Sequence, residues 1–328
     1  MLPFSGNYNR MTKPDLNREV RIGTSGYSYP GPPPKGWSGV FYPATKGRKF
    51  DQLEFYSSLF NTVEVNTTFY RPPALSMADL WARKTPPDFE FAIKAWQKFT
   101  HPLRLGQEAG QREQKWDKPT QADVDLFKRS IGALADSSKL GILLFQYPAS
   151  FHCTKENVER LHWTLSAFEG YAKAVELRHW SWSEKSTEIK TLLDSLGATW
   201  AVIDEPKFAS SVRQEFEPVG KIFYLRLHGR NNEKWWRHGE AWERYDYFYG
   251  PDEIRLFGDK IQRLMQASPT QKTYVFFNNH ARGQALANAL MLKHELAQGS
   301  LAAVPRGLVE AYPQLLGIVQ TVTTDSLF

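Results

Sequence analysis

Polar residues alternate with apolar ones in several short segments of this chain. Glu64 is flanked by two valines, Glu176 by a valine and a leucine, and Arg226 by two leucines. Alternate side chains of a β-strand point to opposite faces of the sheet. If the apolar residues pack against helices, the polar ones face the other side, where a carboxylate can act as a general acid or base.

The same alternation, applied to every such segment, places one set of polar side chains on a common face. The set contains three carboxylates, three cations, one histidine and two amides. Its members are Glu64, Asn66, Lys94, Gln146, Glu176, Arg178, Asp204, Arg226 and His228. Either Asn278 or Asn279 joins them. Buried charges of this kind need partners, and His228 is of the residue type that titrates near neutral pH.

An anionic ligand, phosphorylated or carboxylated, suits this mixture of charges. Arg178 and Arg226 are bidentate donors to such groups, and Lys94 adds a point charge. Glu64 or Glu176 would transfer protons together with His228. The alternative is that the pairs Glu64–Arg226 and Glu176–Arg178 only stabilise the fold.

Other kinds of site receive less support from the sequence. Carboxylates and His228 could bind a divalent metal, but the cations on the same face oppose it and no metal-ligand motif is present, so no cofactor is predicted. Paired carboxylates also allow a glycosidase. Aromatic residues of segment 229–250 could stack on sugars or bases, or could pack a lid.

The segments that carry these residues predict the fold. Eight strands are expected, at 20–26, 62–69, 89–96, 140–148, 172–180, 199–206, 221–229 and 272–280. Helical periodicity lies between most of them, at 49–60, 122–136, 156–170, 188–197, 251–266 and 281–299, and is weak at 207–220. Strands that alternate with helices indicate a parallel sheet, and eight of them a (β/α)8 TIM-type barrel of the α/β class. An open doubly wound sheet is the alternative.

Two long loops follow the third and seventh strands, at 97–120 and 229–250, where barrel enzymes place binding loops. The turn 277–285 opens the last helix, so Arg282 and free backbone N–H groups could bind phosphate there. The predicted organisation is a basic N-terminal tail (1–19), one barrel domain (20–317) and a C-terminal tail (318–328).

The net charge of +6 comes from the first 50 residues. These hold Arg10, Lys13, Arg18, Arg21, Lys35, Lys46, Arg48 and Lys49 against Asp15 and Glu19. Such a segment could bind nucleic acid. The single cysteine, Cys153, excludes an internal disulfide, and no apolar run is long enough for a membrane helix. We expect a cytoplasmic protein without membrane contact.

Several motifs in order resemble the YecE-like family (domain of unknown function 72). They are GTSGYSY (23–29), FNTVEVNTTFYRPP (60–73), FAIKAW (91–96), LFQYP (144–148), VELRHWSW (175–182), YLRLHGR (224–230) and YVFFNNHARGQALANA (274–289). The resemblance implies a TIM-type barrel and also marks Tyr70, Gly229 and Asn278. The insert 30–36 and the long 97–120 loop depart from the family pattern. Likeness to the endonuclease IV and xylose isomerase barrels is fold-level analogy.

The main hypothesis is therefore an enzyme, a hydrolase, lyase or isomerase, acting on a small anionic substrate. Its predicted catalytic residues are Glu64, Glu176 and His228. Its predicted substrate-binding residues are Asn66, Tyr70, Lys94, Gln146, Arg178, Asp204, Arg226, Asn278 and Arg282. The alternatives are a nucleic-acid-binding or endonuclease IV-like protein, a glycosidase-like protein, and a non-catalytic ligand sensor. The sequence leaves the oligomeric state open.

Overall fold

The strands of the chain form two main parallel sheets. The computed structural model describes residues 19–45, 47, 50–104, 114, 115, 118–268, 270–297 and 301–322. One sheet has the strand order β2 (Thr62–Val65), β3 (Glu90–Lys94), β6 (Leu140–Gln146), β7 (Lys173–Glu176), β8 (Ala198–Trp200). The other has the order β1 (Glu19–Thr24), β11 (Lys272–Phe277), β10 (Ile222–Leu227), β9 (Val202–Asp204). The chain is therefore an α/β protein with parallel sheets.

Each of the eight predicted strand segments overlaps an observed strand, and the sixth overlaps two. Ala201 separates β8 from β9, and its N–H donates to the carbonyl of Val175 at 2.9 Å. The Gln214 side chain lies against this break. Its Nε2 donates to Ala201 O at 2.8 Å, and its Oε1 accepts from Ile203 N at 3.2 Å. A side-chain amide thus takes the place of a neighbouring strand beside the break.

The two sheets adjoin at both ends. On one side β8 and β9 follow each other directly in the chain. On the other, Ser25 forms an isolated parallel bridge with Glu64, and Gly26 N donates to Glu64 O at 2.8 Å. The ladders of strand pairing are interrupted at both junctions.

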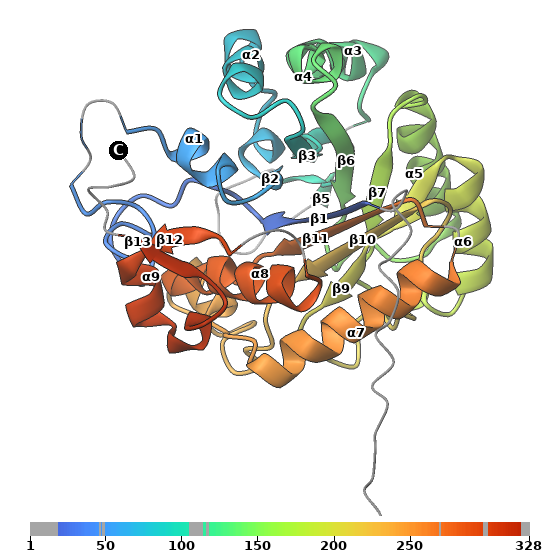
Figure 1. Cartoon of the computed structure of the whole chain (residues 1–328). Helices are drawn as coiled ribbons and strands as arrows, with labels where there is room; N and C mark the ends of the chain where they lie inside the picture. The colour runs from blue at the N-terminus through green and yellow to red at the C-terminus, as the bar shows by residue number, and fades with distance from the viewer. Residues whose placement is uncertain are drawn as a thin grey trace, which may run out of the picture.

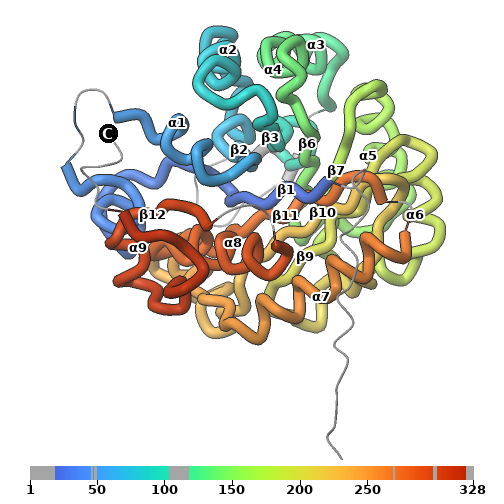
Figure 2. The backbone as a smooth tube through the Cα atoms, viewed as in Figure 1, coloured from blue at the N-terminus to red at the C-terminus, as the bar shows by residue number. Residues whose placement is uncertain are grey.

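The helices lie around the outside of the strands (Figure 1). Figure 2 shows α2 and α4 on one side of the strands and α7 and α8 on the opposite side. The helices are α1 (Gln52–Ser57), α2 (Leu75–Arg83), α3 (Gln121–Ser130), α4 (Gly132–Asp136), α5 (Lys155–Ala167), α6 (Ser186–Ser195), α7 (Pro251–Ala267), α8 (Gln284–Glu295) and α9 (Arg306–Ala311). Several begin at side-chain caps, such as Thr120, which shares a capping box with Asp123.

Three segments show how far the helical periodicity of the sequence predicted the observed helices. The helix expected over 122–136 is two helices, because α3 ends at Ser130 and α4 begins at Gly132, a residue that favours a break. Helix α2 was not expected, and within it only Ala78 and Trp81 are buried. Segment 207–220, which the structure describes throughout, contains no helix, as its weak periodicity predicted.

Apolar residues form an outer and an inner cluster. The outer one lies between strands and helices and includes Ile22, Val63, Val175 and Leu225. The inner one is smaller and combines large rings with small residues. It consists of Ala92, Ile142, Leu144, Ala174, Ala201, Tyr224, Tyr274 and Phe276. Residues from both sheets thus meet in the interior, which is a packed core and not a channel.

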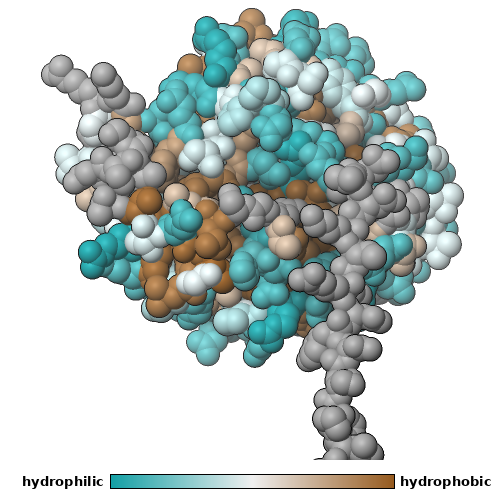
Figure 3. All heavy atoms as spheres, viewed as in Figure 1, coloured by the Kyte–Doolittle hydropathy of each residue, from teal (hydrophilic) through white to brown (hydrophobic). Residues whose placement is uncertain are grey.

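The predicted long loops and tails are described only in part. Loop 97–120 contains the short antiparallel strands β4 (Leu103–Arg104) and β5 (Gln114–Lys115). Residues 1–18 and 323–328 of the predicted tails lie outside the described residues, whereas β13 (Gln320–Val322) pairs with β12 (Ala303–Pro305). In Figure 3, hydrophobic residues gather where Figure 1 shows α8, most of which is buried.

Candidate functional site

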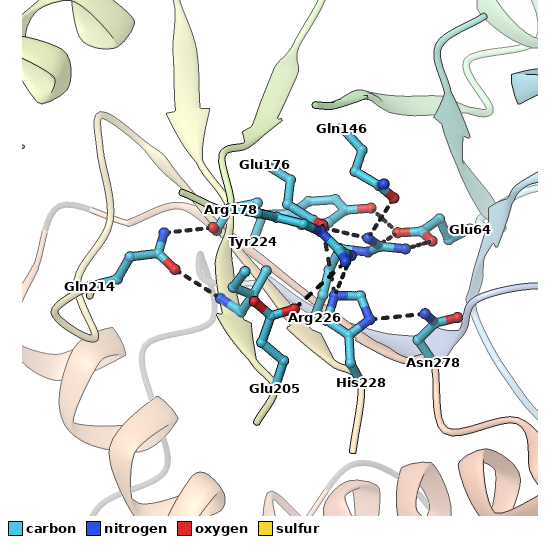
Figure 4. Close-up of polar contacts among 12 residues, drawn as sticks. Glu64, Gln146, Glu176, Arg178, Glu205, Gln214, Tyr224, Arg226, His228 and Asn278 are labelled. Carbon is cyan, nitrogen blue, oxygen red and sulfur yellow. Dashed lines mark hydrogen bonds and ion pairs between the residues drawn. The ribbon is translucent and has the colours of Figure 1, made fainter. Parts of the chain in front are cut away.

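A cluster of buried polar side chains lies at the carboxyl ends of the strands (Figure 4). Glu64 is level with Ala92, Glu176 with Gln146, and Arg226 with Phe276 in the strand register. Paired residues of parallel strands share a face, so these polar residues lie above the inner core, as the alternation predicted. We call the following residues the strand-end cluster: Glu64, Gln146, Glu176, Arg178, Glu205, Tyr224, Arg226, His228 and Asn278.

Arg226 is the centre of this cluster. Its Nε and Nη2 donate to the two oxygens of Glu64, at 2.9 and 2.6 Å. Its Nη1 donates to Glu176 and, at 3.3 Å, to Gln146 Oε1. Tyr224 donates its hydroxyl to Glu64 Oε2 at 2.7 Å. All three nitrogens of the guanidinium group are therefore engaged, and little donor capacity remains for a ligand.

The two carboxylates bonded to Arg226 remain ionised. Burial alone would raise the pKa of Glu64, but the charge and hydrogen bonds of Arg226 outweigh it and lower that pKa. The same opposition holds at Glu176, where Arg178 and Arg226 together lower the pKa well below its usual value. Both side chains are completely buried, so the ion pairs substitute for lost hydration.

Arg178 is bonded less completely than Arg226. Its Nε donates to Glu176 Oε1 at 2.5 Å. Its Nη1 is 3.6 Å from Glu205 Oε2, and its Nη2 is 3.4 Å from His228 Nε2. Both contacts of the terminal nitrogens are long for hydrogen bonds. The end of the guanidinium group thus keeps donor capacity at the strand ends.

His228 is a neutral imidazole within the cluster. Burial first, and then the charge of Arg226, lower its pKa to about 4. Its Nδ1 lies 2.9 Å from the side-chain nitrogen of Asn278, so Nδ1 accepts and the proton resides on Nε2. Nε2 lies 3.7 Å from Glu176 Oε2, so the Nε2–H faces that carboxylate.

The prediction that Asp204 faces the cluster is wrong, and its neighbour Glu205 takes that position. In the strand register Asp204 is level with Leu227, on the outer face. It accepts hydrogen bonds there from Arg230 and from the Tyr249 hydroxyl, the latter at 2.7 Å. Glu205 is 5% exposed, lies near Arg178 and has no hydrogen bond to its Oε2. Its pKa is raised, because burial outweighs the attraction of Arg178.

Lys94 and Asn66 stand side by side at the ends of β3 and β2. Val65 pairs with Ile93, so the next residue on each strand shares the face of the cluster. Lys94 Nζ lies 4.3 Å from the centroid of the Phe69 ring, and Asn66 Oδ1 is buried without a hydrogen-bond partner. Burial first, and then Arg226, lower the pKa of Lys94 to about 7.

Two predicted ligand-binding residues have other surroundings. Tyr70 is 70% exposed, with its ring against Phe69, and no contact joins it to the strand-end cluster within the described residues. Arg282 pairs with Asp246 at 3.3 Å, and its carbonyl accepts from Tyr312. Tyr70 and Arg282 therefore remain candidates only for contacts with a ligand at the edge of the site.

Part of the basic N-terminal segment is engaged within the fold. Arg21 belongs to β1, is 6% exposed and pairs with Glu19 and Glu90. Lys35 pairs with Glu240 at 2.8 Å. Six basic residues lie outside the described ones, namely Arg10, Lys13, Arg18, Lys46, Arg48 and Lys49.

Cavities occur both beside the cluster and away from it. One of about 420 Å³ is lined by Glu205, with Asp204, Pro206, Lys207, Arg230 and Asn232 around it. Another, of about 300 Å³, lies outside β8 and β9, against Trp200 and Val202. Among the described residues, no group of three or more His, Cys, Asp or Glu is arranged to hold a metal ion. In the same residues no helix is long and apolar enough to span a membrane.

Fold and site together define an α/β protein with a buried cluster of charges at the ends of parallel strands. Residues 21–309 match the family model described as "Protein of unknown function DUF72", so the chain belongs to the DUF72 family. This confirms the family that the motifs predicted.

Relatives of this chain align with it over most of their own length. The UPF0759 protein YunF of Bacillus subtilis is 31% identical over 83% of this chain and 96% of its own. The UPF0759 protein YecE of Escherichia coli O157:H7 is 28% identical over 80% and 90%. The crystal structure of a DUF72 family protein from Thermotoga maritima is 33% identical, covers 86% of this chain and 100% of its own, and superposes with a TM-score of 0.70.

Proposed function

We propose that the two sheets are halves of one eight-stranded barrel whose carboxyl-end mouth binds a small ligand with a phosphate or carboxylate group. We propose further that the protein is an enzyme that moves a proton on this ligand. Two observations support the barrel. Residues of both sheets meet in the inner apolar cluster, and the two sheets adjoin at Ala201 and at Ser25. Barrel enzymes place their sites at this end of the strands.

The observation that carries the proposal is a set of incompletely bonded polar groups at the carboxyl ends of the strands. Asn66 Oδ1 and Glu205 Oε2 are buried without hydrogen bonds. Lys94 Nζ forms no ion pair or hydrogen bond with another described residue and rests on an aromatic ring. Buried polar groups left unpaired are destabilising and rare. A bound ligand would satisfy them.

Arg178 is the residue we assign to the anionic group of the ligand. The hydrogen bonds of Arg226 to Glu64, Glu176 and Gln146 occupy its donors. Arg178 has only its Nε in a short hydrogen bond, which leaves its terminal nitrogens for two ligand oxygens. In this assignment Arg226 and Glu64 hold the site together and do not touch substrate.

Proton transfer is assigned to Glu205, together with His228 as a neutral hydrogen-bond donor. Glu205 has a pKa raised by burial, and a carboxyl group with a raised pKa can act as a general acid. The pKa values of Glu64 and Glu176 are lowered, so neither suits the general acid of a glycosidase. Glu176 instead orients Arg178.

A thermal-shift panel of sugar phosphates, nucleotides, 2-oxo acids and short DNA tests this function. We expect a phosphorylated or carboxylated compound to raise the Tm of the wild type and to have no effect on Arg178→Gln. The control is Arg306→Gln, which removes an exposed arginine that pairs with Glu310 on α9 and lines neither of the two cavities. Stabilisation of both variants, or by DNA alone in a salt-dependent manner, contradicts the proposal.

A further inference from the structure

Lys94 differs from the other lysines whose pKa values burial lowers. Lys139, Lys173, Lys207 and Lys293 each donate from Nζ to backbone carbonyl oxygens, which accounts for their burial structurally. Lys94 Nζ has no such acceptor among the described residues and lies over the Phe69 ring instead. The structure therefore gives the other four amines a role in holding the backbone and leaves this amine free to react.

The surroundings of Lys94 favour the neutral, nucleophilic form of its amine. Burial removes the hydration that a charged ammonium group needs, and Arg226 and Arg178 repel a further positive charge. Desolvation and neighbouring cations are the two means by which proteins activate a lysine for attack on a carbonyl group. With a pKa of about 7, a large share of the amine is unprotonated at neutral pH.

We propose that Lys94 forms an imine with its ligand, which makes the substrate an aldehyde, ketone or 2-oxo acid that also carries the anionic group held by Arg178. This inference rests on the proposed function, because it needs the ligand to bind at the same strand ends. It assigns a covalent role to a residue that would otherwise only contribute charge.

The reaction needs only the amine, the carbonyl compound and a proton. The Nζ lone pair forms a bond to the carbonyl carbon, the C=O π electrons move to oxygen, and a proton passes from nitrogen to that oxygen. The resulting hydroxyl group then takes a second proton and leaves as water, while the nitrogen lone pair forms the C=N bond of a protonated imine. Glu205 is assigned to deliver the second proton, because its Oε2 lies 3.6 Å from Nη1 of Arg178, which holds the same ligand, and because burial raises its pKa.

The test is borohydride trapping on the full chain, with pyruvate and pyridoxal 5′-phosphate as two anionic carbonyl compounds. Peptide mass spectrometry then locates the reduced adduct. We expect one adduct per chain, on Lys94, that inorganic phosphate suppresses, with a trapping rate that rises with pH around 7. Lys94→Arg keeps the charge but cannot form an imine, so it should lose the adduct. Lys98→Met is the matched control, since Lys98 follows the same strand but pairs with Asp123.

Different failures have different meanings. Adducts confined to exposed lysines, or equal in wild type and Lys94→Arg, overturn the imine. If phosphate and pyruvate still raise the Tm of the wild type but not of Arg178→Gln, the proposed function survives that failure. If neither compound stabilises the wild type and no adduct forms, both proposals are wrong. Should Lys94→Arg fail to fold, the position of the adduct and the pH profile of the wild type decide the matter.

Discussion

The Arg226 guanidinium group forms a two-pronged ion pair with the Glu64 carboxylate, at 2.9 and 2.6 Å, with both side chains almost completely buried. The same guanidinium reaches Glu176 across the interior. Strands β2, β7 and β10 are thus joined by one side chain. The sequence alone gave Arg178 and Arg226 the same role. The structure distinguishes them, because protein groups occupy the hydrogen-bond donors of Arg226 but not all of those of Arg178.

Arg226→Met should destabilise the fold strongly. The substitution leaves two buried carboxylates without their counter-ion, and loss of one partner of a buried pair costs about 3–5 kcal/mol. Denaturant unfolding measures the loss. A double variant, Arg226→Met with Glu64→Met, should recover part of it, because an apolar pair replaces the unpaired charge. If Arg226→Met is as stable as the wild type, the central ion pair has no structural role.

Stability should fall between about pH 6.5 and pH 4 because of His228. Its pKa drops from 6.5 to about 4 on folding, so in this window the unfolded chain binds a proton that the folded chain does not. Burial, the charges of Arg226 and Arg178, and the hydrogen bond from Asn278 favour the neutral ring, and they outweigh the carboxylate of Glu176, which faces the same ring and favours its charged form. The expected slope is roughly 1.4 kcal/mol per pH unit. His228→Gln should flatten the dependence of Tm on pH in this range, and an unchanged slope contradicts the assignment.

Lys94→Met should stabilise the protein at and below pH 7 by roughly 1–2 kcal/mol. The folded-state pKa is about 7 and the ordinary value is 10.5, so the charged form is disfavoured by folding. Between these two values the wild type becomes more stable as pH rises, and the advantage of the variant shrinks. Unfolding free energies at pH 6.5 and pH 9.5 test this. A Lys94→Met variant that is less stable at pH 6.5 is incompatible with it.

Asp204→Asn and Glu205→Gln should have opposite effects. Asp204→Asn weakens bonds to Arg230 and Tyr249 on the outer face, at a cost of about 1–3 kcal/mol, and should not abolish ligand turnover, because Asp204 has no part in the assigned proton transfer. Glu205→Gln removes a carboxyl group that lacks a hydrogen bond to Oε2, so stability should stay equal or rise while ligand turnover is lost. Paired measurements of Tm and ligand response check both. If the two variants exchange these effects, our orientation of this strand is wrong.

Alternation predicted the position of most of the cluster because apolar and polar residues alternate strictly at 63–66, 175–178 and 225–228. It failed at the sixth segment, where Trp200, Ala201, Val202 and Ile203 are all apolar and both faces look alike. The register with β10 places Val202 outward and Ile203 inward, so Glu205 follows on the inner face. Because of this apolar run, alternation could not predict that Glu205 faces the cluster.

The sequence also could not predict that protein groups occupy the hydrogen-bond donors of Arg226. Whether a guanidinium group has donors to spare depends on how many acceptors surround it, and these come from β2, β6 and β7. Short-range patterns do not contain such distances. Helix α7 buries a complete apolar stripe and was predicted almost to its ends, whereas the nine-residue α2, which buries only Ala78 and Trp81, was not predicted.

The most direct test of the account is calorimetric titration of the wild type, Arg178→Gln and Arg306→Gln with inorganic phosphate and with the anionic compound that best raises the Tm. We predict binding to the wild type and to Arg306→Gln, and an affinity at least about tenfold lower for Arg178→Gln, since a charged hydrogen bond contributes about 1.5–3 kcal/mol. Equal affinity in Arg178→Gln, or loss of binding in Arg306→Gln instead, would contradict the anion site at the strand ends.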